Sequence, residues 1–272
     1  MLNVNTIGQY IPGNSFIHRL DPRTKFFSLL VAVFLVFFLD NLLFLGFLLF
    51  GVILVTFLAG IKPKMFWQAL KPVVFILVLA LILQLFFTPG EKLITLGPLK
   101  ITREGLVNSG IVFLRLVVML LSAYLLTATT SPTELTNGLE SLLKPFGRFG
   151  LPYGEIALML TIALRFIPTL TAEAERLIKA QESRGADFNT RGFSNKAKMM
   201  LPLIIPLFIN AFKRADELAV AMEARGYRIG APRGKLKPLK FAAKDYLFLF
   251  LNLLLTVLFV ILKLWGGFPA KF

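Results

Sequence analysis

Cysteine is absent from this chain of 272 residues, and the only histidine is His18. Disulfides, thiolate metal sites and zinc sites built from clustered histidines are therefore excluded. The sequence also lacks the Walker A pattern G-x-x-x-x-G-K-[ST], so the chain does not bind ATP by that route. We expect no metal site, no cofactor and no catalytic residue.

Acidic residues are also scarce, with 15 Asp and Glu against 30 Lys and Arg. A multi-span membrane enzyme acting on a lipid or prenyl pyrophosphate usually needs clustered carboxylates to hold Mg²⁺. The five Asp residues are instead scattered, at positions 21, 40, 187, 216 and 245. Such an enzyme stays open as an alternative, with no motif in its favour.

Apolar residues dominate, since 56% of the chain is hydrophobic and 28 residues are Phe. The apolar stretch 26–61 would measure roughly 54 Å as one helix, whereas a bilayer core is about 30 Å thick. We therefore expect two antiparallel spans that turn at "LDN". Further spans are predicted at about 67–87, 106–129 and 246–265, with a turn-rich link at 88–105. The fold class is an all-α integral membrane protein with about five transmembrane helices.

The basic residues predict how these spans are oriented. Segments 1–25, 62–71 and 130–245 hold three, three and eighteen of the 30 Lys and Arg residues. These segments alternate with the spans as cytoplasmic loops should, which predicts a cytoplasmic N-terminus in the cell membrane. The net charge of +15 then indicates contact with the lipid bilayer and requires no nucleic-acid partner.

Three regions follow from this layout: four spans in 1–129, a helical cytoplasmic or interfacial insert in 130–245, and a last span in 246–272. Within the insert, Ser131, Pro132 and Glu134 of "SPTE" predict a capped helix start. Two helices of about 48 Å are predicted at 153–184 and 194–225. Their N-terminal halves are apolar and their C-terminal halves polar, which favours helices lying at the membrane interface with polar ends in the cytoplasm. Two additional short spans remain the alternative.

Two other polar features stand near the spans. The segment "HRLDPRTKF" before the first span contains His18, Asp21, Arg23 and Lys25, and we interpret it as a structural anchor for that span. Arg115 lies within the fourth span, where a charge indicates either a functional site or a bond to a neighbouring helix.

The two long helices end in the same way. Shifting "AQESRGADF" by 41 residues aligns it with "AMEARGYRIG", and the match extends back through a shared helical stripe. Each Gly suits the left-handed position beyond a helix end, and each Arg complements the negative helix terminus. Arg-Gly alone could be a simple helix stop, but the matched pair favours two docking tips. The predicted docking residues are Ser183, Arg184, Gly185, Ala224, Arg225 and Gly226, with Glu182 and Glu223 supporting the tips.

The pair "SRG" and "ARG", the segment "HRLDPRTKF" and the five-span layout with its large insert together resemble the transmembrane T component of energy-coupling factor (ECF) ABC transporters. The resemblance implies that the X-Arg-Gly motifs end two coupling helices, which dock into grooves on two identical or homologous ABC ATPases. It also implies a substrate-binding S component that captures a vitamin or a metal ion.

A self-contained secondary transporter is the remaining alternative. Such a transporter is expected to show inverted membrane repeats and broken spans around a midplane site. The repeat in this chain is cytoplasmic and runs in the same direction in both copies, which favours coupling to partner proteins.

Overall fold

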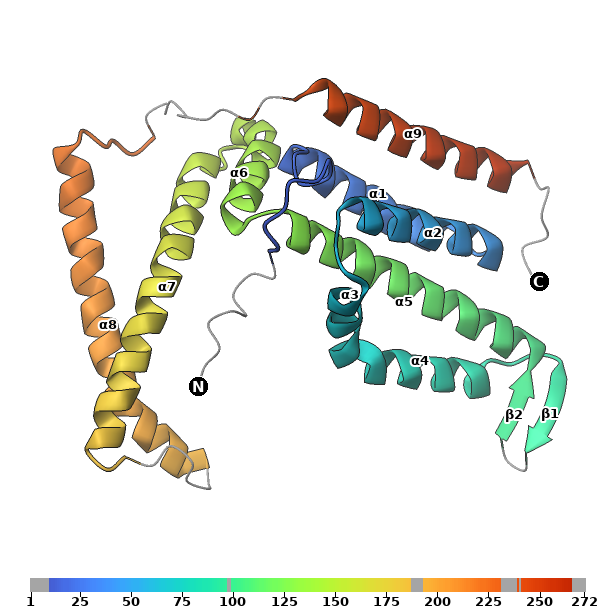
Figure 1. Ribbon diagram of the computed structural model, residues 1–272, viewed down its shortest axis with the longest axis horizontal. Helices are drawn as coiled ribbons and strands as arrows, with labels where there is room; N and C mark the ends of the chain where they lie inside the picture. The colour runs from blue at the N-terminus through green and yellow to red at the C-terminus, as the bar shows by residue number, and fades with distance from the viewer. Residues whose placement is uncertain (1–9, 97–98, 187–192, 231–238, 240, 266–272) are drawn as a thin grey trace. The chain divides into compact units, whose positions relative to one another are not determined.

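The structure is a computed structural model that describes residues 10–96, 99–186, 193–230, 239 and 241–265 (Figure 1). The described residues form two compact units, one within Gly8–Gly138 and Leu239–Phe272, and the other within Leu139–Pro238. We call the first the membrane unit and the second the insert unit. The helical class predicted from the sequence is confirmed.

The long apolar stretch breaks into two helices at the predicted turn, giving α1 (Pro22–Phe38) and α2 (Leu42–Leu58). Asn41 caps α2 by accepting a hydrogen bond from the Leu43 backbone N–H at 2.9 Å. The carboxylate of Asp40 lies 2.6 Å from Arg115 and 3.2 Å from Lys263. Arg115 therefore binds the α1–α2 turn, which favours the helix-bonding interpretation of this charge.

The next span is a broken helix that leads into a hairpin. Its parts are α3 (Pro63–Leu70), the 3-10 turn η2 (Lys71–Val73) and α4 (Val74–Phe87). Pro72 explains the break because it has no N–H to donate to the preceding turn. The link to the next span contains strands β1 (Lys92–Leu96) and β2 (Leu99–Thr102), paired antiparallel. The sequence predicted only that this link is rich in turns and did not predict the strands, which its β-branched Ile and Thr residues favour.

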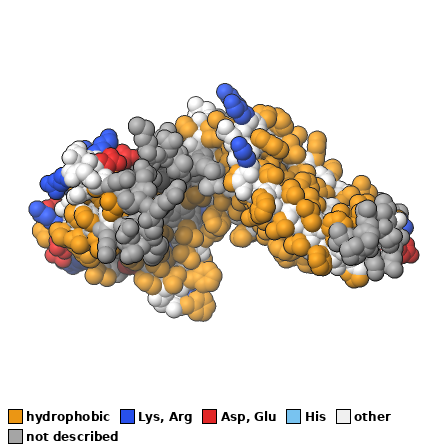
Figure 2. All heavy atoms as spheres, turned by 90° about the horizontal axis from the view of Figure 1, so that it is seen from below, with side chains coloured by type: hydrophobic (Ala, Val, Ile, Leu, Met, Phe, Trp, Pro, Cys, Tyr) orange, Lys and Arg blue, Asp and Glu red, His pale blue; other side chains and the backbone are white. Residues whose placement is uncertain are grey.

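Helix α5 (Arg103–Thr129) is central to the membrane unit and packs against α1, α2 and α4. Val118 and Leu121 of α5 are fully buried, as is Leu45 of α2. The last helix, α9 (Ala243–Leu264), packs against α1. Many large apolar side chains of this unit face outward and are exposed, as expected for helices surrounded by lipid (Figure 2).

Hydrogen bonds fix the directions of α1, α5 and α9. Asp245 accepts from the Asp21 backbone N–H at 2.8 Å, and the Ser28 hydroxyl donates to Asn252 at 3.1 Å. Both pairs join residues that are 224 positions apart, so α1 and α9 run parallel. The Lys25 ammonium donates to the Thr129 carbonyl at 2.8 Å, so α5 runs in the opposite direction. The first and last spans thus begin on the side of the membrane unit where α5 ends, as the predicted topology requires.

The segment before α1 anchors these helix ends. His18 bonds Ser15 and the Ile11 carbonyl, while Ile11 donates through its backbone N–H to Ala128 at the end of α5. Ile17 and Leu20 are buried in one cluster with Ala59, Ile61 and Ala128. The contacts of "HRLDPRTKF" are those of a structural anchor.

The insert begins as predicted with α6 (Pro132–Leu143), whose capping box is present. The Glu134 N–H donates to the Ser131 hydroxyl at 3.3 Å, and the Ser131 N–H donates to the Glu134 carboxylate at 3.1 Å. The 3-10 segment η3 (Lys144–Phe149) follows. Two long helices complete the insert, α7 (Tyr153–Ser183) and α8 (Phe193–Ala224), each within one residue of its predicted bounds.

Among the described residues, four helical segments are long and apolar enough to cross a membrane, judged by length and composition alone. Three of them match predicted spans. The fourth is α7, so the alternative of an additional span falls on this helix. Helices α1 and α2 have 17 residues each, the lower limit for crossing. The four segments are Pro63–Phe87, Arg103–Thr129, Tyr153–Ser183 and Ala243–Lys263.

Candidate functional site

The ends of α7 and α8 have the same backbone hydrogen bonds. At the end of α7, the Gly185 N–H donates to Glu182 at 2.9 Å and the Ala186 N–H donates to Gln181 at 3.0 Å. At the end of α8, Gly226 donates to Glu223 and Tyr227 to Met222, both at 2.9 Å. This pair of bonds defines a Schellman motif. The two copies of the repeat therefore fold into equivalent helix ends.

Both glycines occupy the left-handed conformation that the sequence predicted. Gly185 has φ +89° and Gly226 has φ +83°, values that a residue with a Cβ adopts at a cost of roughly 1–2 kcal/mol. Ser183 and Ala224 are the last residues of their helices, and Arg184 and Arg225 directly follow them.

The tips are accessible to a partner. The predicted residues from Glu182 to Gly185 and from Glu223 to Gly226 are all exposed. Neither Arg184 nor Arg225 forms an ion pair with a described residue. Two guanidinium groups are thus available at the tips, and a guanidinium can bind a carboxylate with two parallel hydrogen bonds.

A polar cluster holds α7 and α8 together where they cross (Figure 1). The Glu173 carboxylate accepts from the Asn210 amide at 2.5 Å and lies 3.2 Å from the Arg214 guanidinium. The Glu173 side chain is only 18% exposed. The sequence interpretation missed this cluster, although the 41-residue shift aligns Glu173 with Arg214. Equivalent positions of the repeat therefore meet at the crossing with opposite charges.

The crossing places the two tips at opposite ends of the helix pair. The Gly230 N–H donates to the Glu155 carboxylate at 3.2 Å, so the segment after α8 returns beside the start of α7 and the helices run antiparallel. Ser183 lies ten residues beyond Glu173, and Ala224 lies fourteen residues beyond Asn210 in the opposite direction. At 1.5 Å per residue, the tips are about 35 Å apart.

The predicted stripe faces inward on α7 and only partly so on α8. The five stripe residues of α7 are all half-buried, namely Leu170, Ala174, Leu177, Ile178 and Gln181. Of the residues of α8 aligned with them by the 41-residue shift, Ala215 and Ala219 are exposed. These two alanines line a groove of about 710 Å³ between the apolar half of α7 and the polar half of α8. The groove is lined by apolar residues of both helices, among them Ile162, Phe166, Leu218 and Met222.

The outward face of α8 is apolar around its proline residues. Leu201, Ile205, Phe208 and Phe212 recur at helical spacing and are all more than half exposed, with Phe212 reaching 67%. The opposite residue, Leu203, is buried. Helix α8 runs without interruption through Pro202 and Pro206, and α7 runs through Pro168. A row of exposed apolar side chains such as this is typical of a surface that binds lipid or protein.

Comparison with known proteins identifies the family. Residues 13–237 match the family model CbiQ, described as cobalt transport protein. The chain is 49% identical over 240 residues to the energy-coupling factor transporter transmembrane protein EcfT of Thermosediminibacter oceani, covering 88% of this chain and 91% of that protein. It is 47% identical over 271 residues to EcfT of Acidaminococcus fermentans, covering 99% and 100%. The match to EcfT of Listeria innocua is 45% over 247 residues, covering 90% and 93%.

These relatives decide between the function classes that the sequence left open. The relatives are transmembrane components of a transporter and are not enzymes, so the alternative of a membrane enzyme is set aside. A self-contained secondary transporter is likewise set aside, because the relatives are named as parts of an energy-coupling factor transporter. This chain belongs to the CbiQ/EcfT family and is the energy-coupling transmembrane component of an ECF transporter.

Proposed function

We propose that this chain couples two ABC ATPase subunits to a substrate-binding S component, and that its complex imports a vitamin or a metal ion. The observation that carries the proposal is the pair of matched helix ends, which have the same hydrogen bonds and exposed Arg residues. Two equivalent tips require two equivalent binding partners. Identical or homologous ATPases meet that requirement.

The separation of the tips supports one ATPase at each. Tips about 35 Å apart at opposite ends of a crossed pair reach two different proteins more readily than one groove. Arg184 and Arg225 each bind a carboxylate of an ATPase. The small residues before them, Ser183 and Ala224, let the helix end enter the groove.

The crossing of α7 and α8 transmits the motion of the ATPases to the membrane. When ATP brings the two ATPases together, the tips move toward each other, and α7 and α8 rotate about Glu173 and Arg214. Their other segments then move with respect to the membrane. The exposed face of α8 that includes Leu201, Phe208 and Phe212 contacts the S component, which reorients and releases its cargo.

The antiparallel pairing argues against α7 as a transmembrane helix. If α7 crossed the bilayer, α8 beside it would place Asp216, Glu217 and Glu223 at bilayer depth, where each charge is unfavourable. It would also place the two tips on opposite sides of the membrane, where one pair of cytoplasmic ATPases could not bind both. We therefore assign α7 and α8 to the cytoplasmic face, with five spans and a cytoplasmic N-terminus.

Charge reversal at the tips tests this function. The full complex is purified with Arg184→Glu, with Arg225→Glu, or with both, and its mass is measured in the absence of nucleotide. Each single change should release one ATPase, and the double change should release both. Arg176→Glu is the matched control, since Arg176 is an exposed cation of α7 away from the tip. Retention of both ATPases by the double variant would show that the tips are only helix stops.

A further inference from the structure

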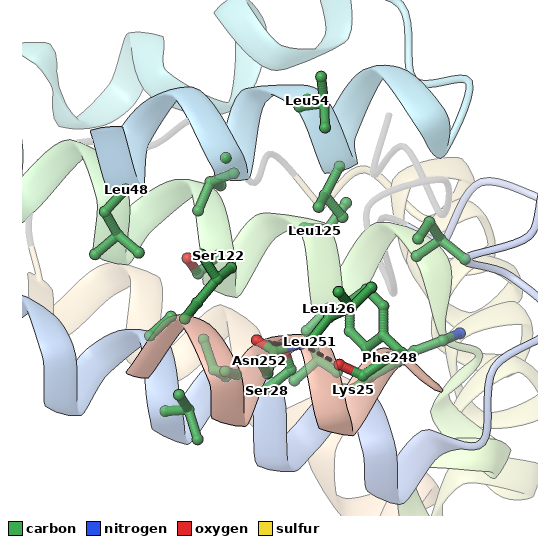
Figure 3. Close-up of a pocket in the computed structure, with 18 of the residues that line it drawn as sticks. Lys25, Ser28, Leu48, Leu54, Ser122, Leu125, Leu126, Phe248, Leu251 and Asn252 are labelled. Carbon is green, nitrogen blue, oxygen red and sulfur yellow. Dashed lines mark hydrogen bonds between the residues drawn. The ribbon is translucent and has the colours of Figure 1, made fainter. Parts of the chain in front are cut away.

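The membrane unit contains a cavity of about 390 Å³ between α1, α2, α5 and α9 (Figure 3). Its volume lies within the range of sites that bind small molecules. Most of its lining is aliphatic or aromatic, including Leu48, Leu54, Leu125, Leu251 and Phe248. The coupling function uses none of these residues.

The length of the cavity matches one leaflet of a bilayer. Along α1 the lining runs from Lys25 to Leu35, and along α9 from Phe248 to Phe259. Ten or eleven helical residues span about 15 Å, half of a hydrocarbon core of about 30 Å. The cavity is therefore about as long as one leaflet is deep, which is the depth that one lipid acyl chain occupies.

The surface end of the cavity is polar. Lys25 is 7% exposed, and its ammonium donates to the His18 carbonyl at 3.2 Å and the Thr129 carbonyl at 2.8 Å. An ammonium has three N–H groups, so one is left for an occupant. Lys244 adds a second cation near the opening, 5.8 Å from the ring centre of Phe16, which also lines the cavity.

A second polar level lies deeper, on three of the four walls. Ser28 of α1 bonds Asn252 of α9, and Ser122 of α5 lies on a third wall (Figure 3). Ser28, Asn252 and Ser122 are each seven residues from the helix ends marked by Asp21, Asp245 and Thr129, which places them at one level about 10 Å inside.

Ser122 is the unusual member of this level. It is 7% exposed, and its hydroxyl has no hydrogen-bond partner among the described residues. A buried hydroxyl without a partner is unfavourable. The hydroxyl oxygen has almost no accessible surface, so a molecule in the cavity does not reach it.

We propose that this cavity binds one membrane phospholipid. Its phosphate lies toward Lys25 and Lys244, and one acyl chain fills the apolar part between Leu35, Leu48 and Phe259. Carboxylates of Asp21 and Asp245 also lie near Lys25, so the cavity selects for the acyl chain more than for net head-group charge. The bound lipid fills the space between α1, α2, α5 and α9 and fixes their packing.

Two glycines of α2 provide a matched test. Gly51 lines the cavity and Gly46 does not, and a Cβ built on either meets no atom within 4 Å. Gly51→Leu should therefore fill the cavity without a clash, whereas Gly46→Leu adds the same side chain elsewhere on α2.

The full complex is delipidated in detergent and titrated with dioleoylphosphatidylglycerol or dioleoylphosphatidylcholine, and bound lipid is counted by native mass spectrometry. The wild type should hold one tightly bound lipid of either kind. Gly51→Leu should weaken this binding at least tenfold, and Gly46→Leu should leave it unchanged.

Equal lipid binding by Gly51→Leu and Gly46→Leu would overturn the proposal. The proposal also fails if a segment of the S component crosslinks into the cavity and displaces the lipid. The lipid count does not depend on the ATPases, so its outcome is separate from that of the coupling function.

Discussion

Replacing Glu173 by alanine tests the crossing of α7 and α8 directly. The change removes the bond to Asn210 at 2.5 Å and the ion pair with Arg214 at 3.2 Å. Hydrogen bonds to charged groups contribute about 1.5–3 kcal/mol, whereas an exposed ion pair contributes about 0–1 kcal/mol. The Glu173 side chain is 18% exposed and that of Arg214 is 42% exposed, so solvent screens the pair only in part. The contribution of this ion pair therefore lies between that of an exposed ion pair and that of a hydrogen bond to a charged group. We expect Glu173→Ala to lower the free energy of unfolding by about 2 kcal/mol.

Two measurements follow the change. In detergent, a loss of about 2 kcal/mol should lower Tm by about 4–8 °C for a chain of this size. Because the chain has no cysteine, Lys179→Cys and Ala221→Cys allow spin labels to be placed near the two tips without other changes. Lys179 lies six residues beyond Glu173 and Ala221 eleven residues beyond Asn210, so the distance distribution between the labels should be centred near 26 Å in the parent chain, at about 1.5 Å per residue. It should broaden when Glu173 is replaced.

Glu217→Ala is the matched control, because it removes an exposed carboxylate of α8 outside the cluster. Exchanging the charges, with Glu173→Arg and Arg214→Glu together, should recover at least half of the lost Tm. If Glu173→Ala gives the same Tm and the same distance distribution as Glu217→Ala, the cluster does not hold the crossing and the reasoning is refuted.

Three other changes have outcomes that the structure fixes. Gly185→Ala, at φ +89°, should destabilise the tip of α7 by about 1–2 kcal/mol and weaken ATPase binding in a pull-down, while Gly154→Ala in the first turn of the same helix should not. Ser131→Ala removes the cap of α6 and should cost about 1 kcal/mol, seen as roughly fivefold faster hydrogen exchange of its first amides. Arg115→Leu leaves the Asp40 carboxylate with Lys263 alone and should lower Tm, and adding Asp40→Leu should restore part of the loss; a further decrease in Tm would contradict the pairing.

The sequence by itself determined the helices and the geometry of both helix ends. The turn at Asn41, the capping box at Ser131 and the glycines at 185 and 226 act through hydrogen bonds within a few residues. Such signals are local, so helix bounds and tip geometry could be predicted from them. The hairpin at 92–102 was missed because a short β pair between two spans gives a weak local pattern.

Only the tertiary structure decided how these pieces meet. The contact between Glu173 and Arg214 joins residues 41 positions apart, and the Arg115–Asp40 pair joins residues 75 apart. Packing of whole helices selects such pairs, and no local pattern specifies them. The repeat implied two equivalent tips, but the antiparallel crossing placed them at opposite ends of one helix pair. The cavity between α1, α2, α5 and α9 is likewise a product of how these four helices pack.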